Sequence, residues 1–391
     1  MQLKSLIEPY HDLVINTRRD LHRIPEVAYT EAKTSAYVAD YLKQEGLAVT
    51  TGIARYGVVG LLDTGRPGPC LLIRADMDAL PITEETGLPF ASQHPGVMHA
   101  CGHDGHTAMA LVTATAMNKL KERINGSIKF VFQPAEEGPG GAKPMIEQGV
   151  MDDPRVDTAL GCHIWPTIPE GTIGIRTGAL LGAMFKFDIT ITGKGGHGAM
   201  PHLCVDALET GCQVVAALQR IVSRKVNPLS PTVITVGKFQ AGTTFNVIPE
   251  RASLSGTART FDKATWKRWP ETIDKVVKGI CESMGAGYET TFEQGYPPTV
   301  NDADVAARMR QIAAQVVGPD QVVVPDKTLG GEDMAYFLEQ VPGCFFCLGA
   351  GNETHAGIHN PRFGFSEKIL ITGVEMYCRA ALDILGGSHG P

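Results

Sequence analysis

A short segment near residue 100 concentrates side chains that bind metals. Residues 99–106 (HACGHDGH) contain one thiol and three imidazoles within eight positions. The adjacent carboxylates Glu136 and Glu137 follow, and then the more distant His163 and His359. Thiolate, imidazole and carboxylate are the ligands of transition-metal sites, and a spare carboxylate suits general-base catalysis. These residue types predict a metal-dependent hydrolase.

The spacing within the two clusters indicates how their side chains point. Cys101 and His103 are one residue apart, so an extended loop directs both the same way. Glu136 and Glu137 are adjacent, so in an extended segment one faces a metal while the other faces the substrate; the alternative is an exposed acidic turn. His106 begins a predicted helix, and we expect it to orient a ligand or cap the helix rather than bind metal.

Three further groups of residues can be interpreted either as part of a functional site or as ordinary structural residues. Asp76 and Asp78 follow a predicted strand, where they either orient ligand histidines or form a solvated turn. A glycine-rich loop, 193–202, holds His197 where the backbone can approach a ligand, but no Lys-Ser/Thr pair follows it, which excludes a phosphate cradle. Arg259 suits bidentate binding of a carboxylate, although an ordinary arginine at a strand end is the simpler reading.

Composition bounds the class of protein. The 391 residues predict two domains, and 43% hydrophobic with 20% charged residues is typical of a soluble globular protein. A net charge of −7 argues against a nucleic-acid surface, and the pair Arg18-Arg19 is interpreted as a solvated helix face. Nine cysteines, an odd number without a framework, favour a reducing compartment. With neither a signal-peptide core nor an apolar run of about 20 residues in the sequence, the expected location is cytoplasmic.

Strands and helices alternate at both ends of the sequence, which predicts an α/β layered sheet. Because the ligand crevice of such sheets lies beyond the carboxyl ends of the strands, the candidate ligands at those ends share one site. The expected strands are 57–62, 70–75, 127–133, 157–164, 321–324 and 344–348, the last containing a buried C-x-x-C; the expected helices are 6–21, 34–45, 104–121, 302–317, 332–339 and 367–385.

The pattern changes between these two α/β regions. Strand, helix, strand, strand, helix and strand follow in the order of a ferredoxin-like unit, at 185–192, 205–221, 232–239, 252–259, 265–284 and 288–293. We therefore expect an inserted α+β domain at 181–295, with the α/β catalytic domain formed by 1–180 and 296–391.

The motifs, in this order, resemble the amidohydrolase branch of the M20 metallopeptidase clan, which contains hippurate hydrolases, N-acyl-amino-acid amidohydrolases and auxin-conjugate hydrolases. The resemblance runs along essentially the whole chain. It rests on the segments 19–26 (RDLHRIPE), 101–106 (CGHDGH), 134–137 (PAEE), 163–165 (HIW), 195–197 (GGH), 331–333 (GED) and 359–361 (HNP).

This resemblance implies roles for individual residues. Two divalent metals, Zn or Mn first and Co or Ni as alternatives, would be held by Cys101, His103, Glu137, His163 and His359, with Cys101 bridging, and Glu136 would be the general base. The inserted domain would serve as a lid and form a homodimer, or a dimer-based tetramer. His197 would reach into the partner's site, while Asn246 and Arg259 would face the substrate's carboxylate.

The implied reaction is hydrolysis of the amide bond of an N-acyl amino acid, including hippurate-like N-aroyl ones, to a carboxylic acid and a free amino acid. Small-molecule substrates are expected, with neither nucleic acid nor membrane as a partner. A dipeptidase or carboxypeptidase with the same two-metal centre is the first alternative. A non-catalytic metal-binding protein is a remote one, since it would not need the spare Glu136.

Overall fold

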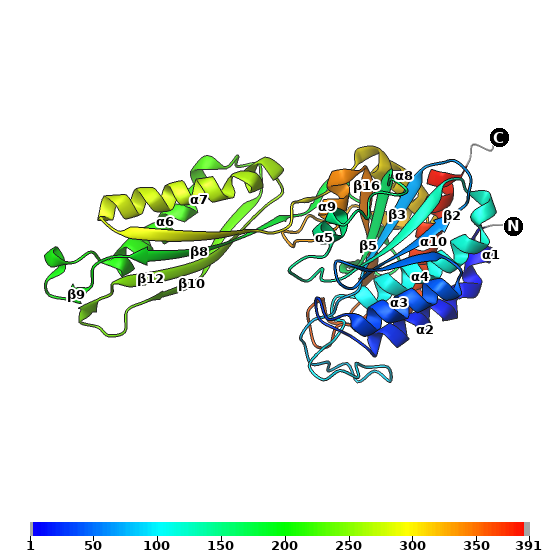
Figure 1. Cartoon of the computed structure of the whole chain (residues 1–391), viewed down its shortest axis with the longest axis horizontal. Coiled ribbons are helices and arrows are strands. Elements are labelled where there is room, and N and C mark those ends of the chain that lie inside the picture. The colour runs from blue at the N-terminus through cyan, green and yellow to red at the C-terminus, as the bar shows by residue number, and fades with distance from the viewer. Residues whose placement is uncertain (1–2, 387–391) are drawn as a thin grey trace. The chain divides into compact units, whose positions relative to one another are not determined.

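The computed structural model describes residues 3–386 and separates into two compact units (Figure 1). Unit 1 comprises Met1–Gly178, Val300–Asp326 and Asp333–Pro391, and unit 2 comprises Ala179–Thr299 and Lys327–Glu332. Unit 1 is an α/β layered structure and unit 2 is a two-layer α+β structure, which confirms the expected fold class. None of the helices within residues 3–386 combines the length and apolar composition of a membrane span.

An eight-stranded mixed sheet forms the centre of unit 1. Its four central strands are mutually parallel and nearly fully buried, as expected for strands that are covered on both faces. In spatial order the strands are β1 (Ala48–Ile53), β2 (Gly57–Asp63), β4 (Ser127–Gln133), β3 (Cys70–Asp76), β5 (Thr158–Pro169), β16 (Gly343–Gly351), β6 (Ile173–Gly174) and β15 (Val322–Val323). Of the candidate ligands, Glu137 follows β4, His359 lies in the loop after β16, and His163 lies in the middle of β5.

Three helices of unit 1, α2 (His11–His22), α3 (Ala32–Gln44) and α10 (Leu370–Leu385), pack against a fourth, α4 (His103–Lys119) (Figure 1). This helix contacts β3, β4 and β5 as well as α2 and α10, so it is buried from His103 through Met117, and after its polar first turn it consists mostly of Ala, Leu, Val, Met and Thr. The helices are α1 (Leu3–Ile7), α2 (His11–His22), α3 (Ala32–Gln44), α4 (His103–Lys119), α5 (Ala142–Glu147), α8 (Ala303–Val317), α9 (Ala335–Gln340) and α10 (Leu370–Leu385).

Unit 2 has the predicted ferredoxin-like order. Its antiparallel sheet runs β10 (Thr232–Ala241), β12 (Arg251–Thr260), β8 (Ala183–Thr192), β13 (Gly287–Gln294), and α6 (Ala207–Lys225) and α7 (Lys263–Met284) pack on one face. Alternate β8 residues such as Phe185 and Phe187 point into the core beneath these helices. Short pairs are formed by β9 (Gly196–His197) with β11 (Val247–Ile248), and by β7 (Gly178–Leu181) with β14 (Thr299–Asn301).

Several short elements, among them α5 and β6, were not expected from the sequence, and two differences lie near the N-terminus. The helix expected at 6–21 is interrupted by a 3-10 turn, Glu8–Tyr10, because Pro9 cannot donate a helical hydrogen bond. The strand β1 was not expected: it is a partly exposed edge strand with two threonines and lacks the alternation of a half-buried strand. Neither difference alters the position of the candidate site.

Candidate metal centre

Four separate segments deliver the five candidate ligands to one place. Cys101 and His103 flank the start of α4, and Gly102 between them has φ 90°, a left-handed conformation that glycine adopts without strain. Glu137 follows β4, and His163 lies in β5 just beyond its last pair with β3. His359 comes from the loop after β16, and its N–H donates to the Ala100 carbonyl at 2.7 Å.

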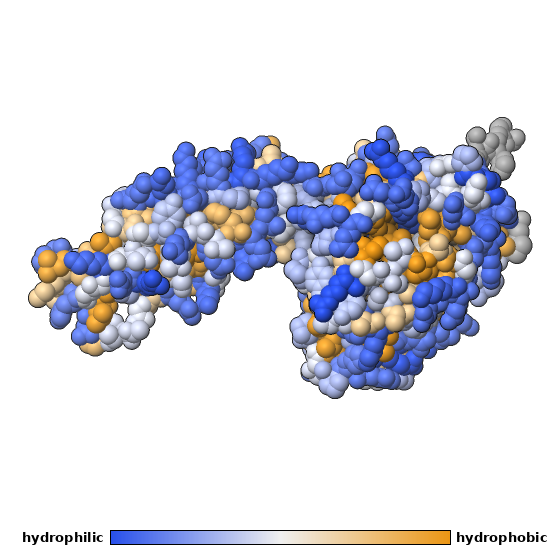
Figure 2. All heavy atoms as spheres, viewed as in Figure 1, coloured by the Kyte–Doolittle hydropathy of each residue, from blue (hydrophilic) through white to orange (hydrophobic). Residues whose placement is uncertain are grey.

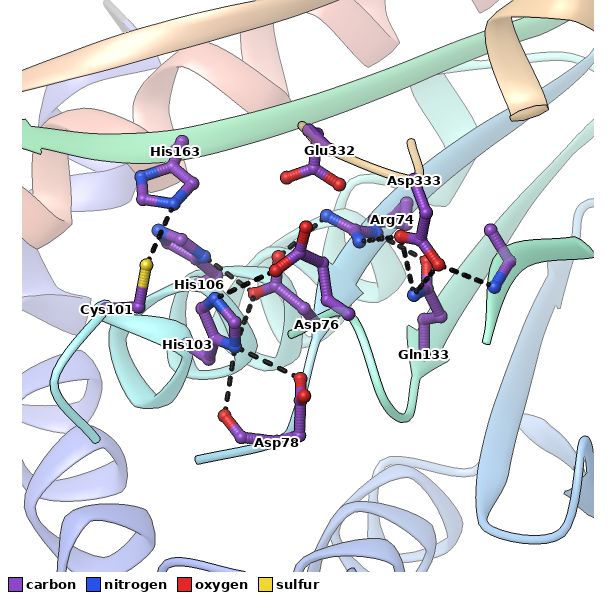
Figure 3. Close-up of polar contacts among 12 residues, drawn as sticks. Arg74, Asp76, Asp78, Cys101, His103, His106, Gln133, His163, Glu332 and Asp333 are labelled. Atoms are coloured by element: carbon purple, nitrogen blue, oxygen red, sulfur yellow. Dashed lines mark hydrogen bonds and ion pairs between the residues drawn. The ribbon is translucent and has the colours of Figure 1, made fainter. Parts of the chain in front are cut away.

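Their ligand atoms form overlapping clusters. Cys101, His103 and His163 make one group within 4.8 Å, and Cys101, Glu137 and His359 make another that shares the thiol. The Cys101 Sγ atom lies 3.4 Å from His163 Nε2, and Glu137 Oε1 lies 3.0 Å from His359 Nε2. Figure 3 shows Cys101 and His163 directed toward each other, with His103 beside them. The structure therefore brings all five candidate ligands together.

The general-base candidate lies beside this cluster. Glu136 is 6% exposed, and its Oε2 atom is 3.9 Å from His103 Nε2. His103, Glu136 and Glu137 also form a group whose ligand atoms lie within 4.8 Å of one another. The alternative of an exposed acidic turn is wrong, since Glu136 is buried against the candidate ligands.

The hydrogen bonds of the histidines leave the correct nitrogen free for a metal. His163 Nδ1 donates to its neighbour's carbonyl at 2.7 Å, and His103 Nδ1 faces the Asp78 carbonyl at 2.9 Å, so each ring presents Nε2 to the cluster. The His103 Nε2 atom is buried and has no hydrogen-bond partner among the described residues. Burial lowers the pKa of His163 and keeps it neutral. This donor set fits a divalent transition metal.

Asp76, the last residue of β3, and Asp78 just beyond it orient histidines, and the solvated-turn alternative is excluded because both are buried. Asp78 Oδ1 lies 3.2 Å from His103 Nδ1, and Asp76 Oδ1 lies 2.7 Å from His106 Nδ1 (Figure 3). His106 Nε2 accepts the Ile164 N–H at 2.8 Å, so both of its ring nitrogens are used. His106 is therefore a positioning residue, as the sequence predicts.

A buried charged network lies beside the cluster (Figure 3). Arg74 donates to Asp76 at 2.6 Å, to Asp333 at 2.9 Å and to Gln133 at 2.8 Å. Asp333 also accepts two hydrogen bonds from the Gln133 amide and one each from the N–H groups of residues 141 and 142. The network joins β3, the end of β4 and the segment before α9, elements that are far apart in the sequence.

The interpretation of Arg18 as part of a solvated helix face is wrong. Its side chain is 2% exposed, and its Nε donates to Asp104 at 2.6 Å. His22 Nδ1 lies 2.7 Å from the same carboxylate. Although burial opposes it, the charges of Arg18 and His22 lower the pKa of Asp104. Since Asp104 follows His103, its pairing with Arg18 holds the ligand-bearing end of α4 against α2. Arg19, whose side chain is 39% exposed, does resemble the expected surface residue.

The expected substrate-binding residues lie in unit 2, at two different places. His197 and Asn246 are exposed neighbours: the Gly198 N–H donates to the Asn246 carbonyl at 2.9 Å. Arg259 is half-buried on β12, eight residues from Arg251, which pairs with Thr192 just before the β9 loop. At about 3.4 Å per residue, Arg259 is about 27 Å from that end of the sheet. Within one chain, His197 and Asn246 are therefore together and Arg259 is apart from them.

Comparison with known proteins agrees with this geometry. The model of peptidase family M20/M25/M40 matches residues 72–383. An N-acyl-L-amino acid amidohydrolase from Geobacillus stearothermophilus is 47% identical over 301 residues, 77% of this chain and 81% of the relative. Thermostable carboxypeptidase 1 from Saccharolobus solfataricus is 39% identical over 95% of each chain. The crystal structure of Bacillus subtilis YXEP, described as a dinuclear metal binding peptidase from the M20 family, superposes with a TM-score of 0.85 at 34% identity, covering 97% of this chain and 99% of the other.

The chain belongs to the M20/M25/M40 peptidase family. Its fold, its buried thiol–imidazole–carboxylate cluster and its relatives define it as a metal-dependent hydrolase of amide bonds.

Proposed function

We propose that this enzyme hydrolyses N-acyl amino acids to a carboxylic acid and a free amino acid. The observation that carries the proposal is the set of five candidate ligands with the extra buried carboxylate of Glu136 beside them. The relative named an N-acyl-L-amino acid amidohydrolase supports this choice of substrate. When bound, two metals would lower the pKa of water and polarise the acyl carbonyl. Thiolate and imidazole favour Zn, Co or Ni, whereas carboxylate ligands also suit Mn.

Within this proposal, the chain's own residues hold the metals and move the protons. Cys101 is shared between the two ligand groups, His103 and His163 complete one, and Glu137 and His359 complete the other. Glu136 takes a proton from the attacking water and passes it to the nitrogen of the departing amino acid. His197 donates a hydrogen bond to the oxyanion that develops on the acyl carbon.

Arg259 is the proposed partner of the amino acid's free carboxylate. Its half-buried guanidinium lines a cavity of about 390 Å³ and has no acidic or hydrogen-bonding side-chain partner among residues 3–386. Burial alone lowers the pKa of this arginine, so an incoming anion would offset a desolvation cost. The neighbouring Lys186, by contrast, already lies 3.3 Å from Glu293.

Arg259→Ala is expected to raise KM about 10- to 100-fold for N-acyl amino acids, because a bidentate charged contact is lost. For the matching amides, which lack the carboxylate, KM should change less than threefold. Steady-state kinetics on both substrate series measures the difference. Lys186→Ala, in the same cavity, is the matched control, and an equal rise in KM for acids and amides would contradict the carboxylate assignment.

The separation of His197 from Arg259 supports a dimer in which each chain completes the other's site. Hydrophobic residues gather on the surface of unit 2 near β9 (Figure 2). Four of these large side chains are exposed by 48–99%, which is typical of a contact surface: Met200, Leu203, Phe245 and Val247. We propose that a second copy covers them and receives His197 and Asn246.

Mixed dimers test this arrangement. His197→Ala and Glu136→Gln chains are each expected to be nearly inactive alone. After they are mixed and allowed to exchange, half of the dimers contain one of each, and one of their two sites is intact, so activity should reach about a quarter of the wild-type value. If the mixture stays as inactive as its components although native mass spectrometry shows that mixed dimers have formed, His197 acts within its own chain.

The function itself is tested by amino-acid release from a panel of acetyl, benzoyl, indoleacetyl and p-aminobenzoyl amino acids and of dipeptides, with and without chelator. Chelator-sensitive release from one acyl class supports the proposal and identifies the acyl group. Cleavage of dipeptides alone would favour the dipeptidase or carboxypeptidase alternative, which the Saccharolobus relative also supports. No release with Zn or Mn restored would reject the proposed substrates.

A further inference from the structure

The segment that carries Glu136 and Glu137 is a tight turn with little regular structure. It runs from the end of β4 to the start of α5, residues 134–141. Ala135 has φ 58°, in the left-handed region that costs a residue with a side chain about 1–2 kcal/mol. The Gly140 N–H closes the turn by donating to the Ala135 carbonyl at 3.0 Å. The direction of Glu136 therefore depends on a strained residue immediately before it.

Three buried carboxylates from other parts of the chain hold this turn. Asp78 Oδ2 accepts the Glu137 N–H at 2.9 Å, while its other oxygen faces His103. Asp333 Oδ2 accepts the N–H groups of residues 141 and 142 at the far end, each at 3.0 Å. Glu31 Oε1 accepts the Ala135 N–H at 2.9 Å. Each carboxylate thus replaces a hydrogen bond that regular secondary structure would otherwise supply.

Glu31 differs from Asp78 and Asp333 in how many of its carboxylate oxygens have a hydrogen-bond partner. It is 0% exposed and lies just before α3, and its Oε2 atom has no hydrogen-bond partner among the described residues. Burial raises the pKa of Glu31 to about 7, with the charge of Asp78 adding to the shift. Burying a carboxylate with one oxygen unsatisfied costs stability. The backbone N–H groups of Ala135, Tyr29 and Glu31 itself stabilise the buried carboxylate, and the Ala135 N–H is the one that belongs to the turn.

We propose that Glu31 is a positioning residue that holds Ala135 in its left-handed conformation and so aims Glu136 at its reacting position. The role of Glu136 as the base rests on the proposed function. The contact by which Glu31 fixes the turn does not depend on that function. Because a displacement of about 1 Å can slow catalysis 100-fold, loss of the hydrogen bond from the Ala135 N–H to Glu31 is expected to lower kcat rather than to weaken substrate binding.

Two conservative substitutions separate the hydrogen bond from the charge. Glu31→Gln keeps the length of the side chain and an oxygen acceptor for Ala135 but removes the charge. Glu31→Asp keeps the carboxylate but withdraws it by one methylene. If Glu31 acts through its hydrogen bond, Glu31→Gln should keep kcat within about threefold of wild type. Glu31→Asp should lower kcat about 30- to 100-fold, while its KM and its metal content stay within about twofold of wild type.

Amide hydrogen exchange supplies a measurement that does not depend on activity. In peptides covering residues 134–142, exchange should be at least about tenfold faster in Glu31→Asp than in wild type and unchanged in Glu31→Gln. The matched control is Glu26, whose carboxylate accepts the N–H groups of Lys33 and Thr34 at 2.9 and 3.0 Å without touching the turn. Glu26→Asp should leave both kcat and the exchange of residues 134–142 unchanged.

The proposal is overturned if folded Glu31→Asp retains wild-type kcat and exchange, or if Glu31→Gln loses kcat while Glu31→Asp keeps it, since the charge would then be what matters. If Glu31→Asp does not fold, Glu31→Gln decides: reduced kcat or faster exchange in that variant rejects the proposal. Wild-type protein that cleaves no acyl amino acid refutes the proposed function instead, and the exchange comparison still tests the hold of Glu31 on the turn.

Discussion

Glu136→Gln is expected to lower kcat by about 10³-fold while the protein keeps its metals and its fold. Glu136 is buried beside His103 yet is not needed to complete either of the two ligand groups that share Cys101. Glutamine has the same shape but cannot accept the water proton, and general-base catalysis contributes about 10²–10⁴-fold. Single-turnover and steady-state kinetics, with metal content measured by elemental analysis, check the prediction.

The control for this substitution is Glu147→Gln, at the end of α5 in the same part of the chain. Its carboxylate is exposed and lies 3.9 Å from Lys143, a surface pair worth little. Glu147→Gln should therefore leave kcat unchanged. Normal turnover in Glu136→Gln would remove the base assignment, and loss of metal in that variant would make Glu136 a ligand instead.

Cys101→Ala is expected to abolish both metal binding and activity, with kcat/KM reduced by more than about 10³-fold. Its thiol is the one atom shared between the His103–His163 group and the Glu137–His359 group. Burial raises the pKa of the free Cys101 thiol, and a coordinated cation would deprotonate it, so metal and thiolate stabilise each other. Metal per chain, measured after dialysis against a limited concentration of Zn or Mn, is the direct readout.

Cys212→Ala is the matched control, because Cys212 is an exposed thiol on α6 in unit 2. It should leave metal content and kcat/KM at wild-type values. Full metal occupancy in folded Cys101→Ala would show that the thiol is not a ligand, and the site would then have to be reassigned to the histidines and carboxylates. Retained occupancy with lost activity would point to a catalytic rather than a ligand role.

The sequence by itself determined the elements and the chemistry of the site. Strands such as β4 and β8 were predictable because burial on one or both faces imposes an alternating or continuous apolar pattern on neighbouring residues. The candidate ligands were recognisable because few functions other than metal binding need a thiol, imidazoles and paired carboxylates at successive strand ends. Both inferences depend on residue types and on local spacing.

Only the tertiary structure decided which contacts fix the site residues in place and which of the site residues are distant from one another. Glu31 reaches Ala135 across 104 positions and Asp333 reaches Gly141 across 192, so no local pattern announces either contact. Burial of Arg18 likewise depends on a carboxylate 86 residues away. The distance between His197 and Arg259 follows from the register of β8 with β12. Contacts of this kind are set by the packing of whole elements, which local sequence periodicity does not encode.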